Sequence, residues 1–345
     1  MSLPYENHLE GDKMVKYIIK RILISVVILL GVSVLLYFLV RLMPVSFIEN
    51  RYYETHGQSP ASEEELYNFL KMYNLHDNSF FGICKGYWDW LCSFVQGDMG
   101  VSFKYGEKVE DVIGRYMGIS FAISFVALIL QLIIAIPLGI KSACNQYGKL
   151  DYTVTVLTMI GMSFPTFFFG SIIIKFFAVD LGWFEVSGLQ TGTLPKDATS
   201  WERFIDMLWH LVLPMFVLVI LSIGSLMRYT RTNTLEVLNA DYIRTARAKG
   251  LSETSVVYKH VFRNTLIPLV TTLAGIIPGL FGGAMITETI FDLPGIGSKA
   301  YAALREGDIP FIMGYNMFIA MLTVLGVLLS DLMYAVVDPR VKLGK

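Results

Sequence analysis

The sequence predicts an all-α integral membrane protein with six transmembrane helices and an extracytoplasmic cap region after the first helix. Of its 345 residues, 54% are hydrophobic, above the roughly 45–50% that is typical of soluble domains. Only 17% are charged, against about 25% in a typical soluble domain. The apolar residues gather in long runs, so the excess apolar surface must face lipid rather than a core.

Two further totals exclude whole classes of function. The net charge of −1 gives no overall field that would attract nucleic acid. The three cysteines form no CxxC pair, which argues against a zinc or redox site. We therefore expect no metal or cofactor bound by this chain.

The chain begins with a polar segment, residues 1–12, which is predicted to be disordered. Basic residues then precede the first apolar run; they are Lys13, Lys16, Lys20 and Arg21. The run, Ile22–Val40, is long enough to cross about 30 Å of hydrocarbon. A signal peptide also has a basic flank, but this run is longer than a signal core and no small-residue cleavage site follows it. We expect residues 1–21 to be a cytoplasmic tail and 22–40 an uncleaved first transmembrane helix.

Residues 41–118 are expected to form an extracytoplasmic region. Ser62–Glu65 is a capping-box pattern followed by apolar residues at helical spacing, which predicts an amphipathic helix outside the membrane. The aromatic stretch Tyr87–Trp90 suits either a small cap or a belt at the membrane interface. Cys84 and Cys92 either pair on an oxidising side or simply pack, because spacing alone does not test disulfide geometry.

Five more apolar runs follow in a core of residues 119–345. They are Ile119–Ile140, Thr153–Val179, Met207–Met227, Leu266–Thr287 and Phe311–Val337. The connections between them alternate between basic and acidic, and the segment 228–265 is the most basic. The positive-inside rule places this segment and both termini in the cytoplasm. Prolines in or beside the runs can bend a helix, although proline is also simply commoner in membrane helices; they are Pro137, Pro165, Pro214, Pro268 and Pro278.

Within this basic segment, the sequence predicts two short helices around a sharp corner. Asn239 is expected to cap the first helix, with Asp241 in its first turn. Gly250 is expected to end it in the left-handed conformation, after the basic residues Arg247 and Lys249. Ser252 is expected to cap the second helix. Such a rigid knob suits docking to another protein, but a solvated basic loop placed there by topology is the simpler alternative.

The residues of this corner carry a resemblance to the signature loop of ABC importer permeases, in DYIRTARAKGLS at 241–252 and HVFRN at 260–264. More narrowly, the chain resembles the first permease subunit of oligopeptide and dipeptide importers. That likeness rests on QGDMGVS at 96–102, ETIFDLPGIG at 288–297 and DLMYAVVDPR at 331–340. It is interrupted mainly in the first outer loop, around residues 78–85.

The resemblance implies that the 239–268 loop is a coupling helix in the cleft of a cytoplasmic ATPase. Three side chains would fill that cleft, namely Tyr242, Ile243 and Ala246. Three would make polar contacts, namely Arg244, Arg247 and Lys249. Further loop positions that match the family are Asp241, Gly250, Leu251, His260, Arg263 and Asn264. The outer segment supplies a candidate outer gate of Glu288, Pro294, Gly295 and Gly297, although Glu288 could instead mark the membrane interface.

The resemblance also implies a set of partners in a bacterial plasma membrane. They are a second homologous permease subunit, two cytoplasmic subunits that bind ATP and Mg, an extracytoplasmic peptide-binding protein, the peptide substrate and membrane lipid. The chain would form half of the translocation pathway of an oligopeptide importer. Dipeptides, nickel chelates and sugar oligomers are carried by the same permease type, so they remain alternatives.

Other classes of function fit the sequence less well. There is no Walker A pattern, so this chain is not itself the ATPase, and no HExxH or GxSxG motif that would indicate a hydrolase. Ser163 and His210 lie on different spans and could imitate a membrane serine protease, but such pairs arise often by chance. A self-sufficient channel or secondary transporter would work without ATP and would be expected to carry an internal repeat, which the sequence does not show.

Overall fold

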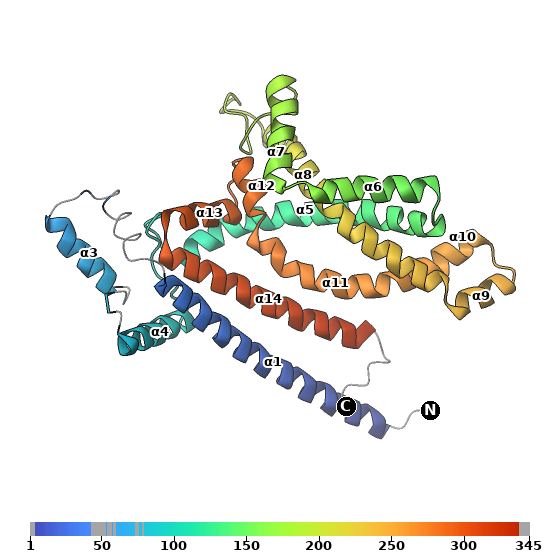
Figure 1. The fold of residues 1–345 in the computed structure, drawn as a ribbon, viewed down its shortest axis with the longest axis horizontal. Coiled ribbons are helices and arrows are strands. Elements are labelled where there is room, and N and C mark those ends of the chain that lie inside the picture. Colours follow the sequence, from blue (N-terminus) through green and yellow to red (C-terminus); the bar gives the residue numbers. More distant parts are fainter. Residues whose placement is uncertain are drawn as a thin grey trace. The chain divides into compact units, whose positions relative to one another are not determined.

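The computed structural model describes residues 4–42, 53, 57, 60–72, 76–77 and 79–337. This part of the chain is helical almost throughout (Figure 1), with one isolated antiparallel bridge between Val101 and Lys108. Within it, four helices are long and apolar enough to cross a membrane, or up to six spans if each of two bent helix pairs counts as one. The prediction of an all-α integral membrane protein is confirmed.

The chain divides into two compact units. The first holds residues 1–117, 299–328 and 339–345, and the second holds residues 118–298 and 329–338.

The first unit begins with a long helix, α1, Pro4–Arg41. The prediction of disorder over residues 1–12 is wrong from Pro4 onward. Proline is tolerated in the first turn of a helix, because the N–H that it lacks would have no partner there. A membrane helix that has already formed can also extend by one hydrogen bond per residue without a new nucleus. The apolar membrane-crossing part of α1 is Ile18–Arg41.

Two shorter helices of the first unit follow, α3 (Pro60–Met72) and α4 (Phe80–Val95). The predicted amphipathic helix is confirmed as α3, although it starts before the expected cap at Ser62. The apolar side of α3 is buried in a cluster that also includes side chains of α1 and of the start of α14 (Ile309–Val337). The buried members of this cluster are Tyr37, Val40, Leu66, Leu70, Ile309 and Met313.

The two cysteines of this unit do not pair with each other. Cys84 and Cys92 are both free, and they lie on the same helix, α4. Eight residues of helix separate them by about 12 Å along the axis, whereas a disulfide needs Cα atoms about 4.4–6.8 Å apart. The pairing alternative is therefore excluded; Cys92 is partly buried, whereas Cys84 is exposed.

In the second unit, two long helices form the frame. α5 is Val109–Cys144, whose first turns belong to the first unit, and α8 is Ser200–Leu238. Thr199 and Glu202 close a complete capping box at the start of α8. Both helices run well beyond the predicted spans, because a helix continues into water wherever its backbone bonds and packing allow. A buried cluster joins α5 and α8 to α11 (Phe262–Gly282); its members are Ala135, Ile223, Leu226, Met227 and Leu269.

The third predicted span is broken rather than continuous. α6 (Lys149–Ser163) is followed by α7 (Thr166–Ile173) and the π-helix η1 (Ile174–Asp180), with a bend of 100° between the two halves. The span predicted over Thr153–Val179 is therefore bent beside Pro165, one of the prolines expected to be able to bend a helix. Phe164 and Pro165 are extended, with ψ of 130° and 136°, because proline lacks the helical donor and pushes the preceding residue out of the helical region.

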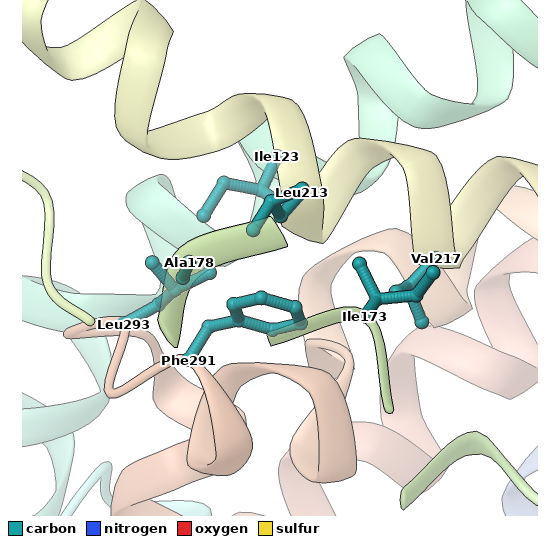
Figure 2. Close-up of a cluster of buried hydrophobic side chains, with 7 residues drawn as sticks. All are labelled: Ile123, Ile173, Ala178, Leu213, Val217, Phe291 and Leu293. Carbon is teal, nitrogen blue, oxygen red and sulfur yellow. The ribbon is translucent and has the colours of Figure 1, made fainter. Parts of the chain in front are cut away.

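The second half of this broken span packs against α8 and against the segment after α11. Figure 2 shows the ring of Phe291 at the centre of this buried cluster. Its members are Ile123, Ile173, Ala178, Leu213, Val217, Phe291 and Leu293. The cluster fixes α7 beside the short helix α12 (Met285–Ile290).

The fifth predicted span, Leu266–Thr287, also ends early. α11 stops at Gly282, and Gly283 takes φ +75° before α12 begins. α13 (Ile296–Glu306) then leads to α14. The sixth predicted span, Phe311–Val337, agrees with α14 to within two residues at its start.

Candidate functional site

A sharp corner joins two short helices at the end of α8. α9 is Asp241–Ala248, and α10 (Glu253–Ser255) continues into the π-helix η2 (Val256–Val261). Gly250 lies between them at φ +80°, a conformation that strains any residue with a Cβ atom. The predicted two helices and left-handed glycine are confirmed.

The caps of these helices agree only in part with the prediction. Asn239 does not cap α9: it ends α8, and its Nδ2 donates to the Leu235 carbonyl at 2.9 Å. Ala240 holds the N-cap position of α9 without a side-chain hydrogen bond. The prediction failed because the last carbonyls of a helix also need donors, and the Asn239 amide supplies one there. Ser252 does cap α10, since its Oγ accepts from the Ser255 N–H at 3.3 Å.

The corner has a small core of its own. Ile243 is fully buried and Ala246 is 7% exposed, and both pack with Val256 and Val261. The expectation that Ile243 and Ala246 fill a partner's cleft is wrong, because their own chain already covers them. Tyr242 is 48% exposed, so it alone of the three remains open to a partner.

The charged side chains of α9 divide into two kinds. Arg247 spans the corner and binds Glu253 through two hydrogen bonds, Nε to Oε1 at 2.8 Å and Nη2 to Oε2 at 3.2 Å. This bidentate pair is formed within the chain itself and links the two sides of the corner. Arg244 lies 3.6 Å from Asp241 on the exposed face, and Lys249 is exposed as well. Arg244 and Lys249 are therefore the basic groups most open to a partner.

The other predicted loop residues lie beside the corner. Leu251 is 41% exposed, and its N–H donates to the Ala246 carbonyl at 3.4 Å. His260 lies in η2, and Arg263 is exposed at the start of α11. Asn264 Nδ2 donates to the His260 carbonyl at 2.6 Å, which supports the junction of η2 with α11.

A charged clasp close to the corner was missed by the sequence reasoning. Asp151 on α6 is 4% exposed and binds Arg231 on α8, with Oδ1 2.7 Å from Nε and Oδ2 2.8 Å from Nη2. Ser142 on α5 also donates to this carboxylate, as does the Tyr147 N–H at 2.9 Å. One buried carboxylate thus joins three helices. Charges near span ends should find partners, but a single sequence does not show which of them pair across 80 positions.

A groove of about 900 Å³ opens between the end of α5, the end of α8 and the corner. Its wall mixes apolar and polar side chains, including Lys141, Leu238, Arg247 and Tyr258. The corner is therefore held by α8, η2 and α11 but leaves space on its α5 side.

The candidate outer gate is organised around one buried carboxylate. Glu288 is fully buried, and its Oε1 accepts from Ser120 Oγ at 2.7 Å and from the Ala284 N–H at 3.0 Å. Its Oε2 accepts from the Ser298 N–H at 3.0 Å. The turn that follows Glu288 encloses it, so the carboxylate does not reach the surface of the chain.

Two glycines of the gate segment make that enclosure possible. A Cβ atom on Gly295 would lie 2.3 Å from Glu288 Oε2, and one on Gly297 would lie 2.8 Å from the same oxygen. Pro294 precedes them and is partly buried. The structure thus brings Glu288, Gly295 and Gly297 into direct proximity.

The residues of the protease alternative have other partners. Ser163 Oγ donates to the Met159 carbonyl at 2.8 Å. The ring nitrogens of His210 lie 3.1 Å from Thr191 Oγ1 and 3.1 Å from the Gly188 carbonyl. Within the described ranges, no group of three or more His, Cys, Asp or Glu side chains is arranged to hold a metal ion.

Comparison with known proteins agrees with this architecture. Residues 135–343 match the family described as binding-protein-dependent transport system inner membrane component. The chain is 38% identical to the oligopeptide transport system permease protein AppB of Bacillus subtilis (strain 168), over 95% of this chain and 100% of that protein. It is 30% identical to the dipeptide transport system permease protein DppB of Escherichia coli (strain K12), over 95% of this chain and 99% of that protein. The chain therefore belongs to the family of binding-protein-dependent transport system inner membrane components, and its resemblance to the permeases of ABC importers is confirmed.

Proposed function

We propose that this chain is a permease subunit of an ATP-driven oligopeptide importer, in which it forms half of the translocation pathway. The observation that carries the proposal is the braced corner at α9, which is built as a rigid body at the end of a long helix. The substrate class is taken from relatives: the AppB protein, at 38% identity, is named for oligopeptides, and the DppB protein, at 30%, for dipeptides. Dipeptides are therefore the nearest alternative, with nickel chelates and sugar oligomers behind them.

The corner is proposed to dock in a cleft of a cytoplasmic ATP-binding subunit. Its inner side is fixed by Ile243 and Ala246, and its outer side is tied by the pair of Arg247 and Glu253. A force applied to α9 therefore moves the corner as one piece instead of unfolding it. The side chains that remain available for contact are Tyr242, Arg244 and Lys249.

Movement of the corner is proposed to pass into the membrane through α8. This helix contains 39 residues and spans about 58 Å at about 1.5 Å per residue. The clasp of Asp151 and Arg231 ties α6 and the end of α5 to the same helix. ATP binding would close the two ATP-binding subunits and swing these helices as a rigid body, which is alternating access by domain movement.

The proposed orientation places the corner and both termini in the cytoplasm of a bacterium, on the basis of the basic residues in 228–265. Residues 41–118 then form the region on the extracytoplasmic side of the first span, and residues 119–345 form the permease core. The proposed partners are a second permease subunit, two ATP-binding subunits that hold ATP and Mg, and an extracytoplasmic peptide-binding protein.

The test is affinity purification of the tagged chain in mild detergent, with identification of the proteins that accompany it. We expect a second permease and two ATP-binding proteins, and ATP-dependent peptide uptake when the complex is placed in vesicles. A chain that purifies alone and carries solute without ATP would instead be a secondary transporter.

A matched pair of variants tests the corner itself. Lys249→Glu reverses an exposed charge on α9, and Lys149→Glu reverses an exposed charge at the start of α6. We expect only the first variant to lose the ATP-binding proteins on purification. Equal retention in both variants would contradict docking through this face.

A further inference from the structure

The helix α4 (Phe80–Val95) lies beside the membrane-crossing part of α1, rather than beyond its end. Tyr87 and Trp90 pack on Tyr37 of α1, with ring centroids 5.6 and 6.2 Å away. The Tyr87 hydroxyl is also 2.9 Å from Ser33 Oγ. These contacts are made within the apolar stretch Ile18–Arg41.

The depth of this contact follows from helix geometry. Ser33 precedes Arg41 by eight residues, which places it about 12 Å further along the helix axis. Arg41 itself donates from Nη2 to the Asp77 carbonyl at 3.1 Å, so the chain just before α4 is held at the end of α1. Trp90 follows Tyr87 on α4 but contacts Tyr37, which is nearer to Arg41 than Ser33 is. α4 therefore crosses α1 at the level of residues 33–37 instead of running along it toward its start.

The face of α4 that does not touch α1 is divided lengthwise into two stripes. The apolar stripe consists of Phe81, Cys84, Trp88 and Val95, which recur at helical spacing on one side. Phe81 is 84% exposed, Trp88 63% and Val95 77%, and Cys84 is exposed.

The polar stripe lies next to the apolar one and consists of Lys85, Asp89 and Ser93, all exposed. A helix in water has no reason to separate its exposed side chains in this way. Separation into an apolar and a polar side is typical of a helix at a membrane interface.

We propose that membrane lipid covers the apolar stripe of α4, with the polar stripe among the headgroups of the same leaflet. The stripe is continuous in depth with the exposed apolar side chains at this end of α1, which include Leu35 at 65%, Leu39 at 60% and Leu42 at 78% exposure. These side chains lie in or directly after the part of α1 that is long and apolar enough to cross a membrane, so lipid over the stripe of α4 would be continuous with lipid beside α1. The indole of Trp88 suits this boundary, because tryptophan is enriched where hydrocarbon meets headgroups.

This assignment divides the aromatic stretch that the sequence left open between a cap and an interfacial belt. Tyr87 and Trp90 pack against α1, whereas Trp88 lies at the boundary between hydrocarbon and headgroups. The segment is then a membrane-embedded brace of the first span. The proposal does not depend on peptide transport, because it uses only the membrane position of α1.

The experiment measures where two points on α4 lie relative to lipid and water. In a Cys92→Ser, Cys144→Ser background, the native Cys84 carries a nitroxide label on the apolar stripe. The matched control removes it by Cys84→Ser and introduces the label through Ser93→Cys on the polar stripe. The full chain is reconstituted, with the subunits that purify with it, into phosphatidylcholine–phosphatidylglycerol vesicles.

Relaxation of each label by oxygen, which is lipid-soluble, is compared with relaxation by a water-soluble nickel chelate. We expect the label at Cys84 to respond severalfold more to oxygen than to nickel, and the label at position 93 to show the reverse preference. A label at Cys84 that responds to nickel as strongly as the control would place the stripe in water and overturn the proposal. A label at Cys84 that responds to neither agent would show that protein covers the stripe, which also overturns it.

Discussion

Loss of the arginine from the clasp between α6 and α8 should destabilise the second unit strongly. In an Arg231→Met variant, the carboxylate of Asp151 loses two hydrogen bonds of 2.7 and 2.8 Å and its counter-charge. Asp151 is only 4% exposed, so water cannot replace the guanidinium. The donors that remain are Ser142 Oγ and the Tyr147 N–H.

The size of the effect can be bounded. Removal of one partner from a fully buried ion pair costs about 3–5 kcal/mol. The Arg231 side chain is 23% exposed and two donors stay in place, so the loss of stability should be closer to the cost of leaving one buried polar group unsatisfied, which is about 1–3 kcal/mol. We expect about 2–3 kcal/mol, which corresponds to a fall in melting temperature of about 5–10 °C for a unit of this size.

Thermal unfolding of the detergent-solubilised protein, followed by intrinsic fluorescence, measures this loss. Arg228→Met is the matched control, because Arg228 is exposed on the same helix and should shift the melting temperature little. The double variant Asp151→Leu/Arg231→Met should be more stable than Arg231→Met alone, since apolar replacement of both partners leaves no buried charge. A single variant that melts like the control, or a double variant no better than the single one, would refute the account of the clasp.

The remaining predictions concern the corner and the enclosed glutamate. Gly250→Val should strain the left-handed turn by about 1–2 kcal/mol and uncouple ATP hydrolysis from uptake; unchanged uptake in vesicles would contradict the role of the corner. Gly295→Ala places a Cβ atom 2.3 Å from Glu288 Oε2 and should lower the melting temperature far more than Gly192→Ala, whose added Cβ meets nothing within 4 Å. Arg247→Ala removes an exposed ion pair worth less than about 1 kcal/mol, so melting should change little. Uptake should nevertheless fall, because the proposed coupling uses the pair of Arg247 and Glu253 to brace the corner, and unchanged uptake would contradict that role.

The positions of the spans could be read from the sequence, but the ends of the helices could not. Apolar runs indicate which segments lie in the membrane, because side chains that face lipid must be apolar. They do not mark where a helix stops, since α5 and α8 both continue into polar sequence. Polar composition likewise predicted disorder before the first span, whereas the helix α1 already begins at Pro4.

The prolines show why the sequence could not predict which individual proline would bend its helix. Pro137 and Pro214 lie inside continuous helices, whereas Pro165 separates two helices that meet at 100°. The local chemistry is the same at all three positions. The difference is tertiary: the half-span after Pro165 is held by the buried cluster around Phe291, which lies far along the chain.

The same limit applies to the candidate site. Gly250 and Ser252 were predicted correctly because a left-handed turn and a helix cap are local requirements. The hydrogen bond between Ser120 and Glu288 joins positions 168 residues apart, and no local pattern contains that information. Mutual burial of such groups emerges only when the helices are assembled.

The apolar face of α9 is covered by its own chain, and this changes which side chains of α9 remain accessible to a partner. Apolar residues at helical spacing were assigned to a partner's cleft, but an amphipathic pattern shows only that one side is covered, not by which chain. Val256 and Val261 of the same chain cover Ile243 and Ala246. The proposed docking would then rely on Tyr242 and on the exposed charges of α9, whose attraction salt screens over about 8–10 Å. Association through this corner should therefore weaken as ionic strength rises, whereas the corner itself, held by its apolar core, should remain folded.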